Sequence, residues 1–359
     1  MKPKPNQITT ANAGWASAKR TITTVQPTVP TGAAGPCPRR EPPIHLRLTF
    51  LVLLVALPGC ASMGRRLTLP GSYLKPPATS VPASGDYEMA EVVATSGETV
   101  VTQFGQALDA EGRVRADWRQ SVTVLFAYGN RMSIAASQPI FSELRRSGVN
   151  VMLFDYPGYG MSGGTPSEAG CYAACEAAYH QLVTHQQVLQ ERIVPIGLSL
   201  GCGVALELST KRDVAGVVLV VPFTRTRDVG TDNLAWYLRW AVPLLARGAR
   251  FDNLSKLPGL RAPLLLVSAS RDQLTSEART QQLLQAAHHA KITHVRVEAD
   301  HNGAWQAAKD LVFRWLAERQ DFGKAGELPP RNNLIQPTST AVMGPAGAGP
   351  APVSGVAEH

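Results

Sequence analysis

Cysteine is scarce in this sequence, with five residues among 359, and no group of cysteine and histidine has the spacing of a zinc site. Cys37 and Cys60 precede the segment that we expect to fold, which leaves Cys171, Cys175 and Cys202. A bridge between Cys171 and Cys175 is sterically possible but uncommon at four-residue spacing. We interpret all three as small buried apolar residues, and we expect neither a metal nor another cofactor.

Acidic residues are nearly absent from the first 59 positions, where Glu41 stands against seven Lys and Arg. These residues account for +6 of the net charge of +8, so the remainder of the chain is close to neutral. A nucleic-acid-binding protein needs its basic residues clustered on a folded face. The distribution therefore argues against nucleic acid as a partner.

Residues 1–44 lack apolar periodicity and are rich in Pro, Thr and Ala, which predicts a disordered leader. The apolar run Leu46–Leu57 is too short to span a bilayer, which takes about 20 apolar residues. A basic pair, a short apolar run and then small residues form the pattern of an export signal. We place this signal at residues 45–59.

The signal ends in Leu57-Pro58-Gly59-Cys60, which resembles the lipobox of bacterial lipoprotein signal peptides, although Pro58 departs from the small residue usual there. The resemblance implies that Cys60 is acylated and anchors a membrane lipoprotein in the bacterial cell envelope. Ala61, where an Asp would favour the inner membrane, points to the outer membrane, facing the periplasm. An ordinary export signal and an apolar segment within a disordered leader are the alternatives.

The rest of the chain divides into a linker at 60–86, a folded domain at 87–322 and a disordered tail at 323–359. In the domain, short β-branched runs alternate with helical stretches, which predicts an α/β fold whose mostly parallel sheet has helices on both faces. The first two strands lie close together and should pair antiparallel. The eight expected strands are Tyr87–Thr95, Thr99–Ala107, Val122–Tyr128, Val149–Asp155, Arg192–Leu198, Gly216–Val221, Pro263–Ser268 and Ile292–Val297. The five expected helices are Gln138–Ser147, Ser167–Leu189, Leu200–Lys211, Thr275–Ala287 and Asn302–Glu318.

The strongest chemical signal is Gly197-Leu198-Ser199-Leu200-Gly201, which lies between an expected strand and an expected helix. That context is typical of a nucleophile elbow, a tight turn that exposes the serine hydroxyl. The flanking glycines let neighbouring backbone pass closely, and the helix N-terminus faces the developing oxyanion. We therefore predict Ser199 as a nucleophile. The alternative is a plain strand-to-helix turn whose glycines serve packing.

A serine nucleophile of this kind needs an acid and then a histidine later in the chain. Asp272 follows the seventh expected strand, and His301 follows the eighth. Open α/β sheets place their sites at these carboxyl ends, so we predict Asp272 as the acid and His301 as the base. A structural role for His301 and a helix-capping role for Asp272 are the alternatives, with Asp228 and Asp232 as weaker candidate acids.

Two backbone N–H groups should stabilise the oxyanion. We expect one from Leu200, directly after the nucleophile, and one from Asn130, in the loop after the third strand. Gly129 gives that loop its flexibility.

Taken together, these motifs resemble the lidless α/β-hydrolase-domain serine hydrolases, a group that includes membrane-associated acyl hydrolases and depalmitoylating thioesterases. The resemblance covers residues 88–318 and implies a three-layer α/β-hydrolase fold that cleaves esters or thioesters. The family usually has His-Gly where this chain has Tyr128-Gly129, and the Tyr side chain is expected to narrow the acyl pocket. The motifs are Tyr128-Gly129-Asn130, Asp155-Tyr156-Pro157-Gly158-Tyr159-Gly160, Ser162-Gly163-Gly164, Gly197-Leu198-Ser199-Leu200-Gly201, Pro222-Phe223, Phe251-Asp252, Arg271-Asp272 and His301-Asn302.

The segment Thr224–Leu260 lies where this fold inserts a cap, and it is too short for a large one. Its apolar residues, among them Trp236, Tyr237 and Trp240, predict one amphipathic helix. The apolar face packs on the body of the domain, lines an acyl-binding groove or touches lipid.

The sequence thus predicts an exported, lipid-anchored serine hydrolase that acts on a small-molecule or lipid acyl ester through an acyl-enzyme on Ser199. Two alternatives remain. One is a serine peptidase of the same fold, although such peptidases generally carry a larger cap. The other is a catalytically silent binding module on the same scaffold.

Overall fold

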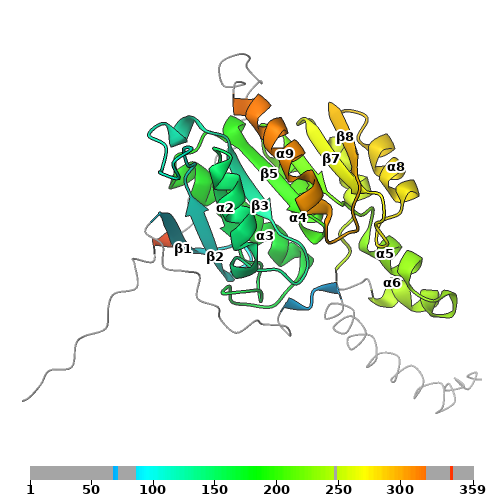
Figure 1. The fold of residues 1–359 in the computed structure, drawn as a ribbon. Helices are drawn as coiled ribbons and strands as arrows, with labels where there is room; N and C mark the ends of the chain where they lie inside the picture. The colour runs from blue at the N-terminus through cyan, green and yellow to red at the C-terminus, as the bar shows by residue number, and fades with distance from the viewer. Residues whose placement is uncertain (1–67, 72–85, 246–248, 321–339, 343–359) are drawn as a thin grey trace, which may run out of the picture. The chain divides into compact units, whose positions relative to one another are not determined.

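The computed structural model describes residues 68–71, 86–245, 249–320 and 340–342 (Figure 1). The expected leader and export signal, and most of the expected linker and tail, lie outside these ranges. Among the described residues, none of the helices is both long and apolar enough to cross a membrane.

One sheet runs through the domain in the strand order β8-β7-β6-β5-β3-β4-β2-β1-β9. The six strands from β3 to β8 are mutually parallel, whereas β2 pairs antiparallel with both β1 and β4. The short β9 lies in the segment that was expected to be a disordered tail, and it pairs antiparallel with β1. The strands are β1 (Tyr87–Val93), β2 (Thr99–Gly105), β3 (Thr123–Ala127), β4 (Asn150–Phe154), β5 (Ile193–Leu198), β6 (Val217–Val220), β7 (Leu264–Ala269), β8 (Ile292–Val297) and β9 (Thr340–Val342).

Helices cover both faces of the sheet (Figure 1). On one face, Lys309 of α9 forms an ion pair with Glu143 of α2 at 2.8 Å. On the other face, α3 packs beside α4. The α-helices are α2 (Gln138–Arg146), α3 (Glu168–Thr184), α4 (Leu200–Lys211), α5 (Thr226–Asn233), α6 (Val242–Leu245), α7 (Asn253–Lys256), α8 (Glu277–Ala286) and α9 (Ala304–Gln320). The 3-10 helices are η2 (Trp118–Gln120), η3 (Ala135–Ser137), η4 (Gln190–Arg192), η5 (Trp236–Ala241) and η7 (Leu257–Gly259).

The central strands are buried on both faces, as expected of a parallel sheet between helical layers. Every residue of β3, β4 and β6 is buried. The prediction of a three-layer α/β fold is therefore confirmed, and all eight expected strands are present with ends shifted by at most two residues. The expected burial of Cys171, Cys175 and Cys202 is also confirmed, because all three are free and buried.

The prediction of one amphipathic helix in the segment Thr224–Leu260 was wrong. This segment forms a series of short pieces, namely α5, η5, α6, α7 and η7. Trp236, Tyr237 and Trp240 are 79%, 60% and 72% exposed, so they do not pack on the body of the domain. Apolar spacing alone does not extend a helix here, because these aromatic side chains have no surface of the domain to pack against.

Asp155 is a fully buried carboxylate directly after β4 that ties together the loops after β3 and β4. It accepts hydrogen bonds from the Tyr128 hydroxyl at 3.0 Å and from the backbone N–H groups of Ile134 and Met161 at 2.8 Å each. Gly160 is required beside it, because a Cβ there would lie 2.0 Å from Asp155 Oδ2. Burial raises the pKa of Asp155 to about 6, and these hydrogen bonds limit the rise.

We expect the contribution of Asp155 to stability to decrease as the pH rises. A carboxyl whose pKa in the folded chain lies above its unfolded value of 3.8 binds its proton more tightly when folded. Relative to an Asp155→Asn variant, the free energy of unfolding of the wild type should therefore fall by up to roughly 3 kcal/mol between about pH 4 and pH 6. Urea titrations across this range measure the difference. A constant difference between the two proteins would contradict the assignment.

Candidate active site

Ser199 occupies a strained turn between β5 and α4. Its backbone has φ 52° and ψ −110°, a conformation that non-glycine residues rarely adopt. The flanking glycines are required by contact. A Cβ on Gly201 would lie 1.9 Å from the carbonyl oxygen of Ala127 in β3, and one on Gly197 would lie 2.4 Å from Cys202 Cα. The turn thus holds the serine at the carboxyl end of β5 and the N-terminus of α4.

The structure brings the three predicted side chains into one hydrogen-bonded chain. His301 Nε2 lies 2.8 Å from Ser199 Oγ, and His301 Nδ1 lies 2.8 Å from Asp272 Oδ2. Asp272 follows β7 and His301 follows β8, which is the neighbouring parallel strand. Parallel strands end at the same edge of the sheet, so Ser199 and His301 meet there although they are 102 positions apart in sequence.

Asp272 is held rigidly as well as paired with His301. Its Oδ1 accepts hydrogen bonds from the backbone N–H groups of Leu274 and Thr275, and its Oδ2 accepts one from the Thr275 hydroxyl at 2.7 Å. The carboxylate therefore also stabilises the turn before α8, but the N-cap of that helix is Ser276, so Asp272 does not take the helix-capping role. Burial favours the neutral acid, but the hydrogen bonds from His301 and Thr275 outweigh it and lower the pKa of Asp272 below its usual 3.8.

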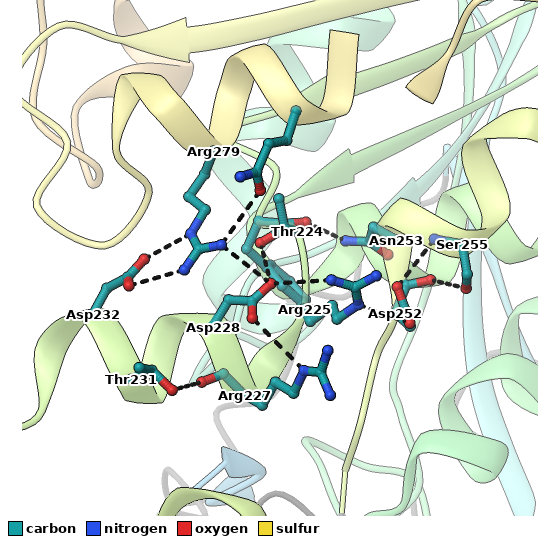
Figure 2. Close-up of polar contacts among 12 residues, drawn as sticks. Thr224, Arg225, Arg227, Asp228, Thr231, Asp232, Asp252, Asn253, Ser255 and Arg279 are labelled. Atoms are coloured by element: carbon teal, nitrogen blue, oxygen red, sulfur yellow. Dashed lines mark hydrogen bonds and ion pairs between the residues drawn. The ribbon is translucent and has the colours of Figure 1, made fainter. Parts of the chain in front are cut away.

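The two weaker candidate acids are engaged elsewhere (Figure 2). Asp232 accepts two hydrogen bonds from Arg279 of α8, at 2.8 and 3.0 Å. Asp228 accepts one from the Thr224 hydroxyl at 2.7 Å and also faces Arg279 at 3.7 Å. These ion pairs fasten α5 to α8.

Asn130 and Leu200 both line the cavity beside Ser199, where the sequence placed the oxyanion donors. The first N–H groups of a helix have no partner within it, so that of Leu200, at the start of α4, is available. The Asn130 side chain is anchored at both ends. It donates to the Thr68 carbonyl and accepts from the Tyr159 hydroxyl, at 3.0 Å each.

The cavity has a volume of about 280 Å³ and a mainly apolar wall. Its lining joins the site residues to α5 and to the loop after β7. The lining residues are Thr68, Asn130, Ser199, Leu200, Phe223, Thr226, Val229, Gly230, Leu274, Thr275 and His301.

The expectation that Tyr128 narrows the pocket was wrong. Its ring is fully buried, and its hydroxyl donates to Asp155. Burial also raises its pKa well above 10, which keeps the phenol protonated as a donor. The local sequence around Tyr128 does not show which way the ring turns, because that depends on the buried carboxylate 27 residues later.

Two supporting residues escaped the sequence analysis as site residues. Thr275 holds Asp272, and Tyr159 holds Asn130. Thr275 carried a signal, since it stands three positions after the predicted acid, and Tyr159 lay inside a recognised motif without an assigned role. In the part of the chain that the structure describes, no group of three His, Cys, Asp or Glu residues is arranged to hold a metal ion.

Comparison with known sequences points to the same fold. A model described as the alpha/beta hydrolase family matches residues 131–252. An uncharacterized protein of Mycobacterium tuberculosis is 28% identical over 249 residues, which cover 68% of this chain and 87% of that protein. Alpha/beta hydrolase domain-containing protein 17C of Xenopus tropicalis is 31% identical over 165 residues, which cover 45% of this chain and 50% of that protein.

Solved structures give the same result for the fold. An esterase of Pyrococcus furiosus superposes with a TM-score of 0.53 at 20% identity, covering 67% of this chain and 91% of the esterase. An alpha-beta hydrolase of Vibrio vulnificus gives 0.55 at 19% identity, covering 65% of this chain and 81% of that one. At such identities the likeness carries the architecture and not the activity. By its strand order, its serine turn and these likenesses, the chain has the α/β-hydrolase fold.

Proposed function

We propose that this protein is a serine hydrolase that cleaves carboxylic esters or thioesters. The observation that carries the proposal is the continuous chain from Ser199 through His301 to Asp272, with 2.8 Å at each link. Hydroxyl, imidazole and carboxylate in this order form the arrangement that activates a serine for acyl transfer.

The geometry supports a two-step reaction. His301 Nε2 takes the Ser199 proton as Oγ bonds to the acyl carbon, and the N–H groups of Leu200 and Asn130 bind the oxyanion. The proton then passes from His301 to the leaving alcohol or thiol, which departs and leaves an acyl-enzyme. A water molecule attacks in the same way and releases the acid. Asp272, ionised and immobile, stabilises the imidazolium in both steps.

The apolar wall of the cavity favours an acyl chain over a peptide. Phe223, Val229 and Leu274 contribute this wall, and the short pieces between β6 and β7 do not amount to a large cap. The likeness to an esterase of Pyrococcus furiosus is consistent with ester cleavage. A serine peptidase of the same fold is the second candidate, and a silent binding module is the third.

We further propose that the protein is exported and anchored through a lipid on Cys60 in the bacterial cell envelope. The support is the sequence of residues 45–61. A lipoprotein cysteine carries a diacylglyceryl group and an N-acyl chain. Stable membrane attachment takes two or more acyl chains, so this modification of Cys60 would be sufficient.

The first prediction from the proposed function concerns Ser199. We expect a fluorophosphonate to form one covalent adduct with the purified protein, because His301 makes the hydroxyl nucleophilic. Intact-mass spectrometry detects the adduct, and Ser199→Ala is the control that should carry none. A wild-type protein that stays unmodified would leave the binding module as the better description.

The second prediction concerns Asp272. Asp272→Asn keeps the size of the side chain but removes the charge that stabilises the imidazolium, so we expect kcat on a short-chain ester to fall by roughly 10³–10⁴. Asp300→Asn is a matched control, because Asp300 precedes His301 and accepts a hydrogen bond from Gly303 N at 2.7 Å. If Asp272→Asn retains near-normal turnover, the acid is another residue.

The third prediction concerns the anchor. Cys60→Ser removes the acylated thiol, so the protein should move from the membrane fraction of a bacterial lysate to the released fraction. Cys37→Ser should leave the partition unchanged. An unaltered membrane share for the Cys60 variant would rule out lipid attachment at this position.

A further inference from the structure

A cluster of exposed apolar side chains projects from η5. Trp236, Tyr237, Leu238 and Trp240, which we name the aromatic ridge, are 79%, 60%, 41% and 72% exposed. Four of the nine exposed large apolar residues in the described part of the chain thus fall within five consecutive positions. The rings of Trp236 and Tyr237 pack edge to face, with their centroids 5.9 Å apart. Such clustering differs from the scattered single exposures that are ordinary on protein surfaces.

The aromatic ridge is continuous with one wall of the cavity. Thr226, Val229 and Gly230 of α5 line that wall. Val242, the first residue of α6 and the residue directly after η5, lies over Gly230, where a Cβ would meet Val242 Cγ1 at 3.2 Å. Leu234 N donates to the Gly230 carbonyl at 3.0 Å. A surface that covers the ridge therefore also lies next to the cavity.

The charge around the ridge is positive. The described residues 224–245 and 249–252 contain four Arg and three Asp, and Arg279 of α8 adds a fifth cation. All three acids are engaged, since Asp228 and Asp232 face Arg279 of α8 and Asp252 accepts a hydrogen bond from Arg225 at 2.9 Å (Figure 2). Arg227 has an exposed side chain that faces Asp228 at 3.7 Å, and Arg239 is exposed within the ridge itself. Net cationic charge beside exposed tryptophan favours an anionic, partly apolar surface.

We propose that the aromatic ridge docks on an anionic phospholipid bilayer and positions the cavity over acyl esters held in that bilayer; the second clause rests on the proposed function. Tryptophan and tyrosine settle at the headgroup level, where one end of the ring is apolar and the other is wet. Arginine adds attraction to phosphates.

The exposed area favours lipid over a protein partner. A large aromatic side chain offers at most about 250 Å², so the three rings at their observed exposures offer roughly 500 Å². A standard protein interface buries about 800 Å² on each partner. Interfacial insertion into a bilayer has no such minimum, because it scales with the apolar area inserted.

The test uses the full chain carrying Cys60→Ser, so that no acyl chain anchors it, with vesicles of phosphatidylcholine alone or mixed with phosphatidylglycerol. Hydrogen exchange read by mass spectrometry reports protection at residues 234–242 directly, whatever else touches the vesicle. We expect protection there with the anionic vesicles, and its loss in a Trp236→Ala/Trp240→Ala variant. Val114→Ala/Leu189→Ala is the matched control, because it removes two exposed apolar side chains elsewhere and should behave as wild type.

A kinetic comparison tests the second clause. The ridge variant should lose at least about ten-fold in kcat/KM on an ester embedded in anionic vesicles, and should keep wild-type kinetics on a soluble short-chain ester. Equal losses on both substrates would mean damage to the cavity and would overturn the docking role.

The remaining outcomes separate the hypotheses. Absence of protection at 234–242 with anionic vesicles, or equal protection in the ridge variant, overturns the proposal. Protection that depends on protein concentration without vesicles, together with the mass of a dimer, assigns the ridge to a second copy instead. Vesicle-dependent protection in a protein that forms no fluorophosphonate adduct would leave the docking surface standing and would remove the hydrolase assignment.

Discussion

The structure depends on how closely the start of α4 approaches the backbone of β3. Gly201 lies so close to the Ala127 carbonyl that a Cβ on it would not fit. This close approach holds Ser199 in a conformation that L-residues rarely adopt. Strain of this kind costs of order 1–3 kcal/mol and persists where the surroundings over-determine it. Here the surroundings are buried parallel strands on both sides of β5 and a helix that begins one residue later. In return, the serine hydroxyl is presented at the sheet edge with a helix N-terminus behind it.

Around this turn, the side chains of Asp272 and Asn130 are held by groups outside the chain from Ser199 to Asp272. Asp272 is fixed by the turn before α8, and the Asn130 side chain is fixed by Tyr159 and Thr68. Asp155 joins the loops after β3 and β4 through its hydrogen bonds. Its burial raises the pKa of this carboxyl to about 6. These supports matter for the proposed acyl transfer, because that reaction requires donors that are already in place when charge develops on the oxygen.

The segment between β6 and β7 is held mainly by polar contacts at its start and not by burial. Its first two pieces, α5 and η5, bury none of their residues, and α5 is held to α8 through Arg279 and the two aspartates. Exposed ion pairs contribute little to stability, so this network serves better as a positioning device than as a source of free energy. It leaves the aromatic ridge facing outward next to the cavity.

The sequence by itself determined the α/β class, the strand positions within two residues, the serine turn and the two loops that carry Asp272 and His301. These features follow from local signals, namely two-sided burial of short β-branched runs, glycines at a tight turn, and chain order along a parallel sheet. Only the tertiary structure decided that Tyr128 turns away from the cavity, that Tyr159 and Thr275 support the site, and that residues 224–260 break into pieces with their aromatic side chains exposed. Each of these depends on partners that are distant in sequence or on the absence of a packing surface, and local periodicity carries information about neither.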